Sequence, residues 1–564
     1  MIREFVKKSP LLRRLSRIYS FTHNQPAWAR LLARERASWN AALKKAEEGP
    51  EVLIATSTGA QLAGTTLESL IAVALTLRGV NVHALLCDTF LPACLLCSTE
   101  WYPNQKNFSK FGPSRDLCKY CFPAAYRMYK GLGITVHRYS EFLSRLELKE
   151  AERISSTIPY EKIADFTLEN IAVGEHALAG ALRFYARGDL ENEPYAEAVL
   201  RRYFKSALET TYVMQNLLKN SRFESSLFHH GIYVPQGLIG EVCRQKGIRV
   251  VNWNPAYRKK CFIFSHNDSY HHTMMSEPVE SWVGLPWNNT MENELTEYLQ
   301  SRWKGTRDWI WFHEKPKFEL DSIASELGID FSKPSIGMLT SVMWDAVLHY
   351  PSNAFKDMKE WMIRTIDYFI KRPESQLIIR VHPAEIRGTL PSRQLMCDEI
   401  KKMYPQLPKN IIVIPPESRV STYAIMLECD AIIIYNTKMG IELAPSGIPI
   451  IVAGEAWVRN KGFAIDINSP QEYFKTLDGL PIKKQMIPEQ ILKAKKYAFH
   501  FFFRRMIPVE CLEQTRGIPP YKISLSTLGD LMPGRSEGLD VICNGILNGS
   551  EFIYPAEYHM RGKE

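Results

Sequence analysis

The chain has 564 residues, which at roughly 100–200 residues per domain predicts two to four domains. Hydrophobic residues make up 45%, aromatic residues 11% and charged residues 23%, which excludes a disordered chain, and ordinary glycine and proline counts (31 and 33) exclude collagen-like and low-complexity chains. The net charge of +9 is mild for this length; it is compatible with an anionic ligand or a membrane surface, and we expect no nucleic-acid partner.

Residues 1–50 are expected to form a basic, helical N-terminal segment. Within the first 21 residues, four apolar side chains recur at helical spacing (Phe5, Leu12, Leu15 and Tyr19). Six cations and a single anion accompany them. Such a basic amphipathic helix can lie on an anionic bilayer, which would make the inner-membrane surface a partner. The alternative is that the apolar stripe packs on the protein itself, and Pro10 would break a long helix.

Neither a transmembrane helix nor a signal peptide is expected. No apolar run reaches ~18 residues, and the best candidate, residues 83–97, contains Asp88 and Pro92. Arginines interrupt any apolar segment near the N-terminus. We therefore expect a cytoplasmic protein, held on the inner face of the membrane if the first helix binds lipid. In that compartment the eleven cysteines should be thiols or metal ligands rather than disulfides.

From Glu51 the sequence alternates between short apolar runs and helical segments. EVLIATS (51–57) is followed by a glycine-containing turn, a helical segment and the run VNVHALLCD (80–88). This order is typical of the first β–α–β unit of a doubly wound sheet. The turn, with Gly59 and Gly64, superficially resembles a phosphate-binding loop. It lacks the lysine that reaches the β- and γ-phosphates in such loops, so ATP hydrolysis is not expected. A plain strand-to-helix turn explains these glycines equally well.

Two cysteine pairs, Cys94-x-x-Cys97 and Cys118-x-x-Cys121, stand twenty residues apart. This spacing matches a four-thiolate zinc site. The intervening loop has few apolar residues, so a metal ion would supply folding energy that the loop lacks. Four protein thiolates would complete the coordination sphere, and the zinc would therefore be structural. The alternative is a set of unrelated thiols or a redox pair.

The remainder of the first half repeats the alternation. Residues 149–220 are mostly helical and charged. The strand-like SSLF then leads into His229, His230 and Gly231, and a helix and the run IRVVNWN follow. The Trp-rich segment 301–318 is interpreted as a linker.

A second cycle begins near Ser335 with five apolar runs, SIGMLTSV, QLIIRVHP, NIIVIP, AIIIYN and IPIIVAG, separated by helical segments. Continuous runs of this kind belong to parallel sheets covered on both faces. The chain after Pro488 is expected to be helical and then irregular. Its aromatic segment, residues 497–508, is interpreted as a helix that crosses back to the first half, with a membrane-facing patch or core packing as alternatives.

The predicted architecture is α/β, with two Rossmann-like doubly wound domains facing a ligand-binding cleft and a small zinc-binding loop inserted in the first. The expected parts are a basic segment (1–50), an acceptor domain (51–305, zinc loop about 90–125, helical insertion about 149–220), a linker (306–330), a nucleotide-donor domain (331–485) and a C-terminal crossover and tail (486–564).

One strand end of the second half carries groups suited to a phosphate. Arg380, His382, Pro383 and Glu385 lie in or just after the run QLII, and Pro383 biases His382 towards an extended conformation that aims its imidazole into the cleft. A guanidinium and an imidazole there suit a phosphate or diphosphate, and a structural histidine is the alternative.

A second strand end adds shorter polar groups. After the run AIII, Asn436, Thr437 and Gly440 can bind a phosphate through side-chain and backbone N–H groups. Glu442, on the first turn of the following helix, can accept from ribose hydroxyls, or it is simply an acid favoured by the helix dipole.

The order RVHPAE, a polar-Gly-x-Glu helix and SGIPIIVAG resembles the C-terminal half of GT-B glycosyltransferases. The likeness is greatest to bacterial capsule and surface-polysaccharide transferases, including Kdo-transferase-like and polysialyltransferase-like enzymes. In that group a His-Pro pair and a later Ser/Thr pair hold the phosphate of the donor nucleotide. His382 and Pro383 match the first pair, whereas Asn436-Thr437 replaces the second. The resemblance spans about residues 335–462 and is weaker over 51–253.

The resemblance implies a glycosyltransferase of capsule polysaccharide biosynthesis that needs no catalytic metal. It would move a sugar from a CMP-sugar or a UDP- or GDP-sugar to a surface polysaccharide or glycolipid acceptor. The His-Gly turn resembles one in related polymer transferases, which makes His230 the first candidate for the general base and Asp88 the second. The cluster His266, His271 and His272 competes with them.

Three other functions remain compatible with this architecture. Sugar-nucleotide epimerases and glycerol-phosphate polymer transferases share it, and a non-catalytic scaffold in polysaccharide assembly would keep nucleotide binding without turnover.

Overall fold

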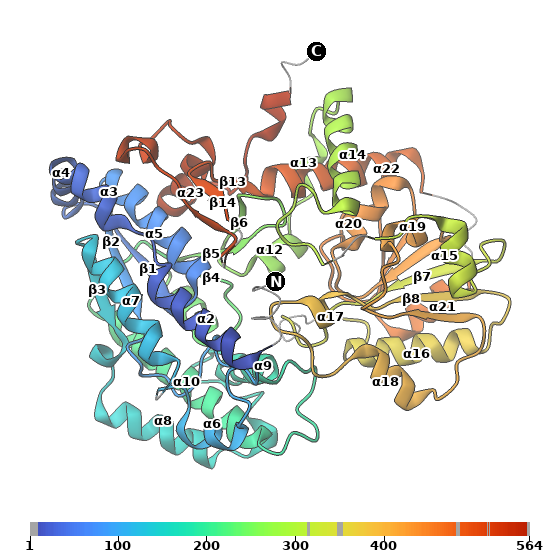
Figure 1. Cartoon of the computed structure of the whole chain (residues 1–564), viewed down its shortest axis with the longest axis horizontal. Helices are drawn as coiled ribbons and strands as arrows, with labels where there is room; N and C mark the ends of the chain where they lie inside the picture. The colour runs from blue at the N-terminus through green and yellow to red at the C-terminus, as the bar shows by residue number, and fades with distance from the viewer. Residues whose placement is uncertain are drawn as a thin grey trace.

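The computed structural model describes residues 9–114, 116–312, 316–346, 353–480, 486–515, 517 and 519–560. Two α/β halves lie side by side, each built on its own mostly parallel sheet (Figure 1). The first sheet contains β1 (Glu51–Ser57), β2 (Asn81–Leu86), β3 (Thr135–Arg138), β4 (Ser225–His229), β5 (Arg249–Pro255), β6 (Cys261–His266) and β13 (Ile507–Pro508). The second contains β7 (Ser335–Leu339), β8 (Gln376–Arg380), β9 (Ile411–Ile414), β10 (Ala431–Ile434), β11 (Ile450–Val452) and β12 (Ile465–Asp466).

Both sheets have the strand order of Rossmann-type folds. The first runs β13-β6-β5-β4-β1-β2-β3 and the second β12-β11-β10-β7-β8-β9, so the first six strands of each follow the order 3-2-1-4-5-6. In the first sheet β6 pairs antiparallel with β5. The central strands are buried on both faces, as their continuous apolar runs predict. The predicted α/β class with parallel sheets is confirmed.

Helices cover both sheets. Those of the first half are α2 (Pro10–His23), α3 (Trp28–Arg34), α4 (Arg36–Ala46), α5 (Leu62–Leu77), α6 (Gln105–Phe111), α7 (Cys118–Gly131), α8 (Arg145–Thr157), α9 (Val173–Tyr185), α10 (Ala196–Leu217), α11 (Gln236–Gln245), α12 (Tyr270–Met275), α13 (Glu280–Val283) and α14 (Asn289–Lys304). Those that follow are α15 (Leu320–Leu327), α16 (Met358–Ile370), α17 (Ala384–Arg387), α18 (Met396–Met403), α19 (Thr422–Met426), α20 (Met439–Leu443), α21 (Pro470–Leu477), α22 (Pro488–Phe499) and α23 (Glu537–Asn548). A small hairpin pairs β14 (Leu512–Gln514) with β15 (Tyr521–Ile523).

The first described helix, α2, packs on the protein through cations and through apolar side chains, because Ile18 and Phe21 pack against the core of the first half. Arg13 and Arg17 pair with Glu100 at 3.2 and 3.0 Å, and Arg14 pairs with Asp116. Leu11, Leu15 and Tyr19, one turn apart, are exposed. Of the predicted stripe, Leu15 and Tyr19 therefore do not pack on the protein, Leu12 is half-buried, and Phe5 lies outside the described residues.

The aromatic segment after α22 carries the chain back to the first half (Figure 1). Residues His500–Arg505 continue α22 as a π-helix in which Phe501, Phe502 and Phe503 are buried. β13 then adds to the first sheet by pairing antiparallel with β6. These phenylalanines belong to the core, so a membrane-facing patch here is excluded.

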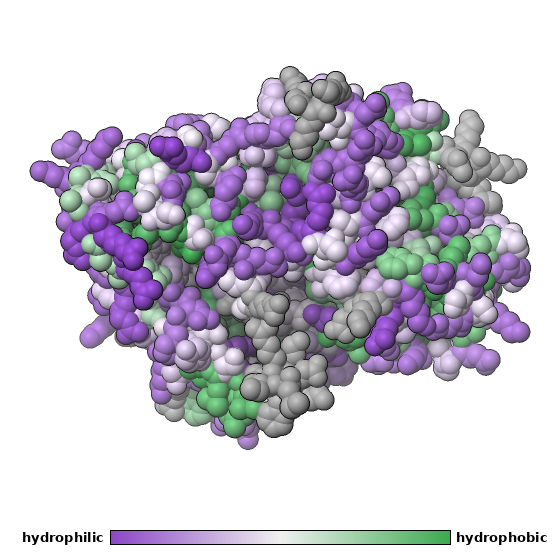
Figure 2. Space-filling view, turned by 45° about the horizontal axis from the view of Figure 1, so that its top comes forward, coloured by the Kyte–Doolittle hydropathy of each residue, from purple (hydrophilic) through white to green (hydrophobic). Residues whose placement is uncertain are grey.

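Most of the face shown in Figure 2 is hydrophilic, with hydrophobic residues in scattered patches. Within the described ranges, no helix is both long enough and apolar enough to cross a bilayer.

Candidate active site

A cavity of about 340 Å³ lies between the two halves. The second half contributes residues at or just after the carboxyl ends of β7, β8, β10 and β11. The first half contributes the end of β5, α12 and the segment after α14. β7 and β10 are neighbours in the sheet although two strands separate them in sequence, so the cavity lies at a topological switch point, where doubly wound sheets bind ligands.

The structure brings together some of the predicted donor-site residues and separates others. Arg380, His382, Pro383, Asn436 and Thr437 line the cavity, whereas Glu385, Gly440 and Glu442 do not.

Arg380 is a buried cation beside this cavity. It is 2% exposed, and its guanidinium donates to Thr422 Oγ1 at 3.2 Å and to the backbone carbonyls of Pro415 and Ser418. Burial lowers the pKa of Arg380 to about 10, so it stays protonated at neutral pH. In the portion of the chain that the structure describes, no carboxylate forms an ion pair with it. A buried charge without a counter-ion is costly, and an anion in the cavity would offset that cost.

His382 is held in one tautomer at the cavity wall. Its Nδ1 accepts from the backbone N–H of Ala384 at 3.0 Å, so in the neutral ring Nε2 carries the proton. Its own N–H donates to Thr340 Oγ1 at 3.2 Å, and Phe312 packs edge-on against the ring. The side chain thus presents a donor suited to an anionic oxygen.

Short polar side chains complete this side of the cavity. Ser341, after β7, hydrogen-bonds to Asn436 Oδ1, after β10, and Thr437 Oγ1 accepts from the N–H of Met439 at 3.4 Å. Gly440 has a packing role instead, because a Cβ there would lie 3.0 Å from Ile434 Cδ1.

The position of Glu442 contradicts the expectation that its carboxylate accepts hydrogen bonds from ribose hydroxyls. It is 4% exposed and bonded to Arg302 at 2.9 Å, to Tyr423 and to Lys438. Burial would raise the pKa of Glu442, but the charges of Arg302 and Lys438 lower it to about 2. Since both carboxylate oxygens are engaged in this cluster, none is left for a ligand.

The position of Glu385 likewise contradicts the expectation that it binds the donor. It is fully buried, both oxygens lie 3.3 Å from the N–H of Met396, and burial raises its pKa to about 7. The carboxyl therefore supports the start of α18 rather than a ligand.

The two predicted bases lie off the cavity. Asp88 accepts from Ser140 N at 3.1 Å and from its hydroxyl at 2.5 Å, which ties the end of β2 to the turn after β3. His230 follows β4 in a left-handed conformation (φ 68°), and its ring packs 5.6 Å from that of His271. His271 does line the cavity, and burial together with the neighbouring charge of His272 lowers its pKa to about 3.

The other members of that histidine cluster lie elsewhere. His266 bonds to the carbonyl of Ser550 at 2.8 Å, and His272 pairs with Asp268 at 3.0 Å. Neither lines the cavity.

Sequence reasoning missed a carboxylate at the cavity. Asp345, six residues after β7, is exposed and accepts from Tyr233 Oη at 2.7 Å. Tyr233 comes from the first half, so the bond joins the two halves. Its ring also packs against that of His230. The only sequence signal is an acid soon after an apolar run, which is too common to single out.

An aromatic wall was also missed. Tyr257, Tyr270, Trp311 and Trp457 line the cavity, and Lys438 Nζ lies 4.6 Å from the ring centre of Tyr257. The expected linker therefore supplies part of the site through Trp311. Flat apolar rings beside hydrogen-bonding groups suit a base or a sugar ring.

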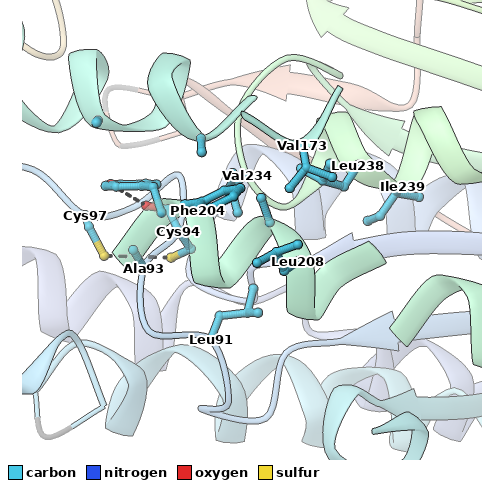
Figure 3. Packing of buried hydrophobic residues seen from close by; sticks show 14 of the residues in the cluster. Leu91, Ala93, Cys94, Cys97, Val173, Phe204, Leu208, Val234, Leu238 and Ile239 are labelled. Carbon is cyan, nitrogen blue, oxygen red and sulfur yellow. Dashed lines mark hydrogen bonds between the residues drawn. The ribbon is translucent and has the colours of Figure 1, made fainter. Parts of the chain in front are cut away.

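The four cysteines of the predicted zinc loop are all buried, and the sulfurs of Cys94 and Cys97 lie 4.0 Å apart (Figure 3). Across the described ranges, no three His, Cys, Asp or Glu side chains are grouped so that they could hold a metal ion.

No protein-family model and no curated protein matches this chain. Among solved structures, the β-Kdo 2,4-transferase KpsC of Thermosulfurimonas dismutans is 12% identical with a TM-score of 0.32, over 49% of this chain and 79% of its own. A UDP-GlcNAc 2-epimerase of Neisseria meningitidis bound to UDP-GlcNAc is 11% identical with a TM-score of 0.22, over 79% and 94%. The spinosyn rhamnosyltransferase SpnG is 10% identical with a TM-score of 0.26, over 80% and 96%. Because these TM-scores are so low, none of the likenesses supports a conclusion about this chain.

Proposed function

We propose that this protein is a GT-B-type glycosyltransferase that moves a sugar from a CMP-, UDP- or GDP-sugar to a surface polysaccharide or glycolipid. The observation that carries the proposal is Arg380, a buried cation that pairs with no carboxylate among the residues the structure describes, beside a cavity between two Rossmann-type sheets. That arrangement favours an anionic ligand at the switch point.

In this proposal the donor diphosphate or phosphate takes the place of the missing counter-ion. Arg380 would supply charge, and Nε2–H of His382 and the side chains of Asn436 and Thr437 would donate hydrogen bonds. These groups stabilise the negative charge that grows on the departing phosphate as the sugar–oxygen bond breaks. The aromatic wall would pack against the base or the sugar.

The acceptor hydroxyl needs a base, and Asp345 is the carboxylate best placed for that role. It lines the cavity and pairs with no cation in the described chain. Tyr233 orients it through its hydroxyl. His230 packs on both Tyr233 and His271 and would act by positioning them rather than by touching the acceptor.

A thermal-shift panel with CMP, CDP, UDP, GDP and ADP tests the donor site on wild type, on His382→Ala and on a matched control, His23→Ala, which changes an exposed histidine at the end of α2. A nucleotide at 100 times its Kd should stabilise the fold by about 2.7 kcal/mol. We expect a shift with one nucleotide that His382→Ala loses and the control keeps. No shift with any of them would contradict the donor site.

A turnover measurement distinguishes sugar transfer from epimerase chemistry and from a non-catalytic scaffold. Incubation of the nucleotide-sugar with and without a glycolipid acceptor should release free nucleotide only when the acceptor is present. Release without any acceptor would indicate epimerase-type chemistry, and binding without release would indicate a scaffold.

A further inference from the structure

Cys94 and Cys97 are the two ends of a single β-turn in the segment after β2. The N–H of Cys97 donates to the carbonyl of Cys94 at 2.9 Å, which closes the turn, and the two sulfurs lie 4.0 Å apart (Figure 3). The Cα atoms at the ends of a β-turn are less than about 7 Å apart, and disulfides span Cα–Cα distances of about 4.4–6.8 Å. Both thiols are free, so the backbone already holds the pair at a separation that suits a disulfide.

The two thiols differ in their access to solvent. Cys94 is 9% exposed, whereas Cys97 is fully buried. A small oxidant therefore reaches Cys94 first, and Cys97 lies beside it as the thiol that can attack the oxidised sulfur. A cysteine sulfenic acid next to a second thiol condenses with it to a disulfide.

The turn between the two cysteines is bonded to the interface between the halves. Leu95, inside the turn, donates its N–H to the carbonyl of Val234 at 2.8 Å, and its own carbonyl accepts from the guanidinium of Arg183 at 2.6 Å. Its side chain is buried in a small apolar cluster that includes Tyr233 of the first half and Ala346 of the second. A change in this turn therefore acts on a contact between the halves.

Tyr233 connects this cluster with the cavity that Asp345 lines. Its hydroxyl donates to Asp345 at 2.7 Å and accepts from the N–H of Ala346 at 3.2 Å. The guanidinium of Arg183, which is bonded to Leu95, lies 5.3 Å from the centre of the Tyr233 ring. The cysteine turn and the carboxylate at the cavity are therefore joined through the same tyrosine.

We propose that Cys94 and Cys97 form a reversible disulfide that shifts Tyr233 and Asp345 at the cavity. The class of oxidant is a hydroperoxide. The Cys94 sulfur attacks one peroxide oxygen and the O–O bond breaks, so the other oxygen leaves as water or an alcohol and Cys94 becomes a sulfenic acid. The Cys97 sulfur then attacks the Cys94 sulfur, the S–O bond breaks and water leaves. The two thiols thus give two electrons and two protons to the peroxide, and a dithiol reverses the step by exchange.

Formation of the bond changes the geometry of the turn. The sulfurs must approach by about 2 Å, from 4.0 Å to the S–S length of about 2.05 Å. We expect the turn to tighten and the hydrogen bonds of Leu95 to weaken. The disulfide does not depend on the proposed function, since neither cysteine lines the cavity; only an effect of oxidation on sugar transfer rests on it.

The experiment treats the reduced full chain with hydrogen peroxide, blocks the remaining thiols and maps the cysteines by mass spectrometry. We expect a link between Cys94 and Cys97 that a dithiol removes. Cys97→Ser should instead hold Cys94 as a sulfenic acid that dimedone captures, and Cys94→Ser should form neither product. The control is Cys243→Ser, which changes a fully buried cysteine of α11 and should behave as wild type.

Amide hydrogen exchange measures the effect at the cavity wall without any nucleotide. In the oxidised protein the amides of Leu95 and Ala346, which donate to Val234 and to Tyr233, should exchange several-fold faster, and those of α16 should not change. Peroxide-treated Cys94→Ser should keep the exchange rates of its untreated form.

The wild-type protein alone decides the outcome if a cysteine variant does not fold. No link in wild type, a link that involves other cysteines, one equivalent of zinc that protects both thiols from peroxide, or a disulfide that leaves the two exchange rates unchanged would each overturn the proposal. Failure of every nucleotide to bind the reduced protein would contradict the proposed function and leave this test intact.

Discussion

Arg380 combines two properties that are rarely found together, near-complete burial and the lack of a carboxylate partner in the described chain. Among the described residues its three hydrogen-bond acceptors are neutral oxygens, which engage three of the five guanidinium N–H groups and do not offset the charge. An anion in the cavity would offset that charge.

Replacement of this guanidinium should therefore weaken anion binding more than it weakens the fold. Because a hydrogen bond to a charged group contributes roughly 1.5–3 kcal/mol, Arg380→Met should reduce nucleotide affinity by about 10- to 150-fold. Arg380→Lys, which keeps the charge, should lose less. Calorimetric titration with the nucleotide found in the panel measures this. The control is Arg372→Met, an arginine of the same half that pairs with Asp478. Equal losses in Arg380→Met and the control would refute the role of Arg380.

The buried carboxyl group of Glu68 leads to a prediction about how stability depends on pH. It is fully buried between Thr56 (2.6 Å) and Trp253 (2.9 Å), and burial raises its pKa to about 7. Between pH 4.5 and 7 the folded protein holds a proton that the unfolded chain has lost, so stability falls as pH rises through this window and then levels off. The full effect is about 3 kcal/mol.

Glu68→Gln should remove that pH dependence while keeping a hydrogen-bonding side chain of the same size. Relative to wild type, the unfolding temperature of the variant should therefore be higher at pH 8 than at pH 5. Thermal unfolding followed by circular dichroism from pH 5 to 8 measures this, with the exposed Glu47→Gln as control. A constant difference between variant and wild type across this range would show that Glu68 is ionised in the folded state throughout.

Residues at strand ends could be predicted from sequence because a short apolar run and the polar residues after it are contiguous. Arg380, His382, Asn436 and Thr437 were found in this way and all line the cavity. Asp345 could not be found, because its role depends on Tyr233, 112 residues away in sequence. Glu385 and Glu442 were wrongly assigned to a ligand, because the local sequence does not show the buried groups with which they interact in the structure.

At the scale of elements, the long apolar runs were predicted correctly and the short edge strands were missed. All five predicted strands of the second half exist, from β7 to β11. β12 and β13 have two residues each, too few to show a pattern. β3 (TVHR) is as long as β9 and β10, but three of its four residues are polar, so it does not stand out as an apolar run. β6 is longer, but it runs antiparallel, against the β–α–β alternation used to find its neighbours.

Helix α2 leads to a prediction about membranes. Arg13, Arg14 and Arg17 are paired with carboxylates of the protein, so they contribute little to binding of a lipid surface. The exposed apolar side chains of α2 and the cations that precede the helix in the sequence would have to bind the lipid instead. We expect Leu11→Ser/Leu15→Ser to reduce co-sedimentation with anionic vesicles at low salt several-fold, since burial of apolar area drives such binding. The control is Leu146→Ser, which changes an exposed leucine of α8. Vesicle binding that is unchanged, or absent in wild type, would contradict a membrane role for α2.

At the scale of the molecule, several contacts join the two halves. The crossover after α22 returns to the first sheet. Another junction, which we call the clasp, joins residues 186–193 after α9 to Arg393 and Gln394. In the clasp Gln394 donates to Asp189 at 2.6 Å and accepts from Gly188 N at 2.9 Å, and Arg393 pairs with Glu193 at 2.9 Å. We expect a ligand between the halves to bind best when the clasp is closed.

Loosening the clasp should lower affinity without a change in any residue of the cavity. If Arg393→Ala/Gln394→Ala reduces the fraction of closed molecules, the apparent Kd for the nucleotide should rise by the same factor, because only the closed form presents both walls. We expect a several-fold rise, together with a larger radius of gyration in small-angle scattering of the free protein that returns towards the wild-type value at saturating nucleotide. Arg153→Ala, which removes an exposed ion pair within α8, is the control. An unchanged radius with a weaker Kd would show that these side chains act on the ligand directly, and an unchanged Kd would show that the clasp does not set the distance between the two halves.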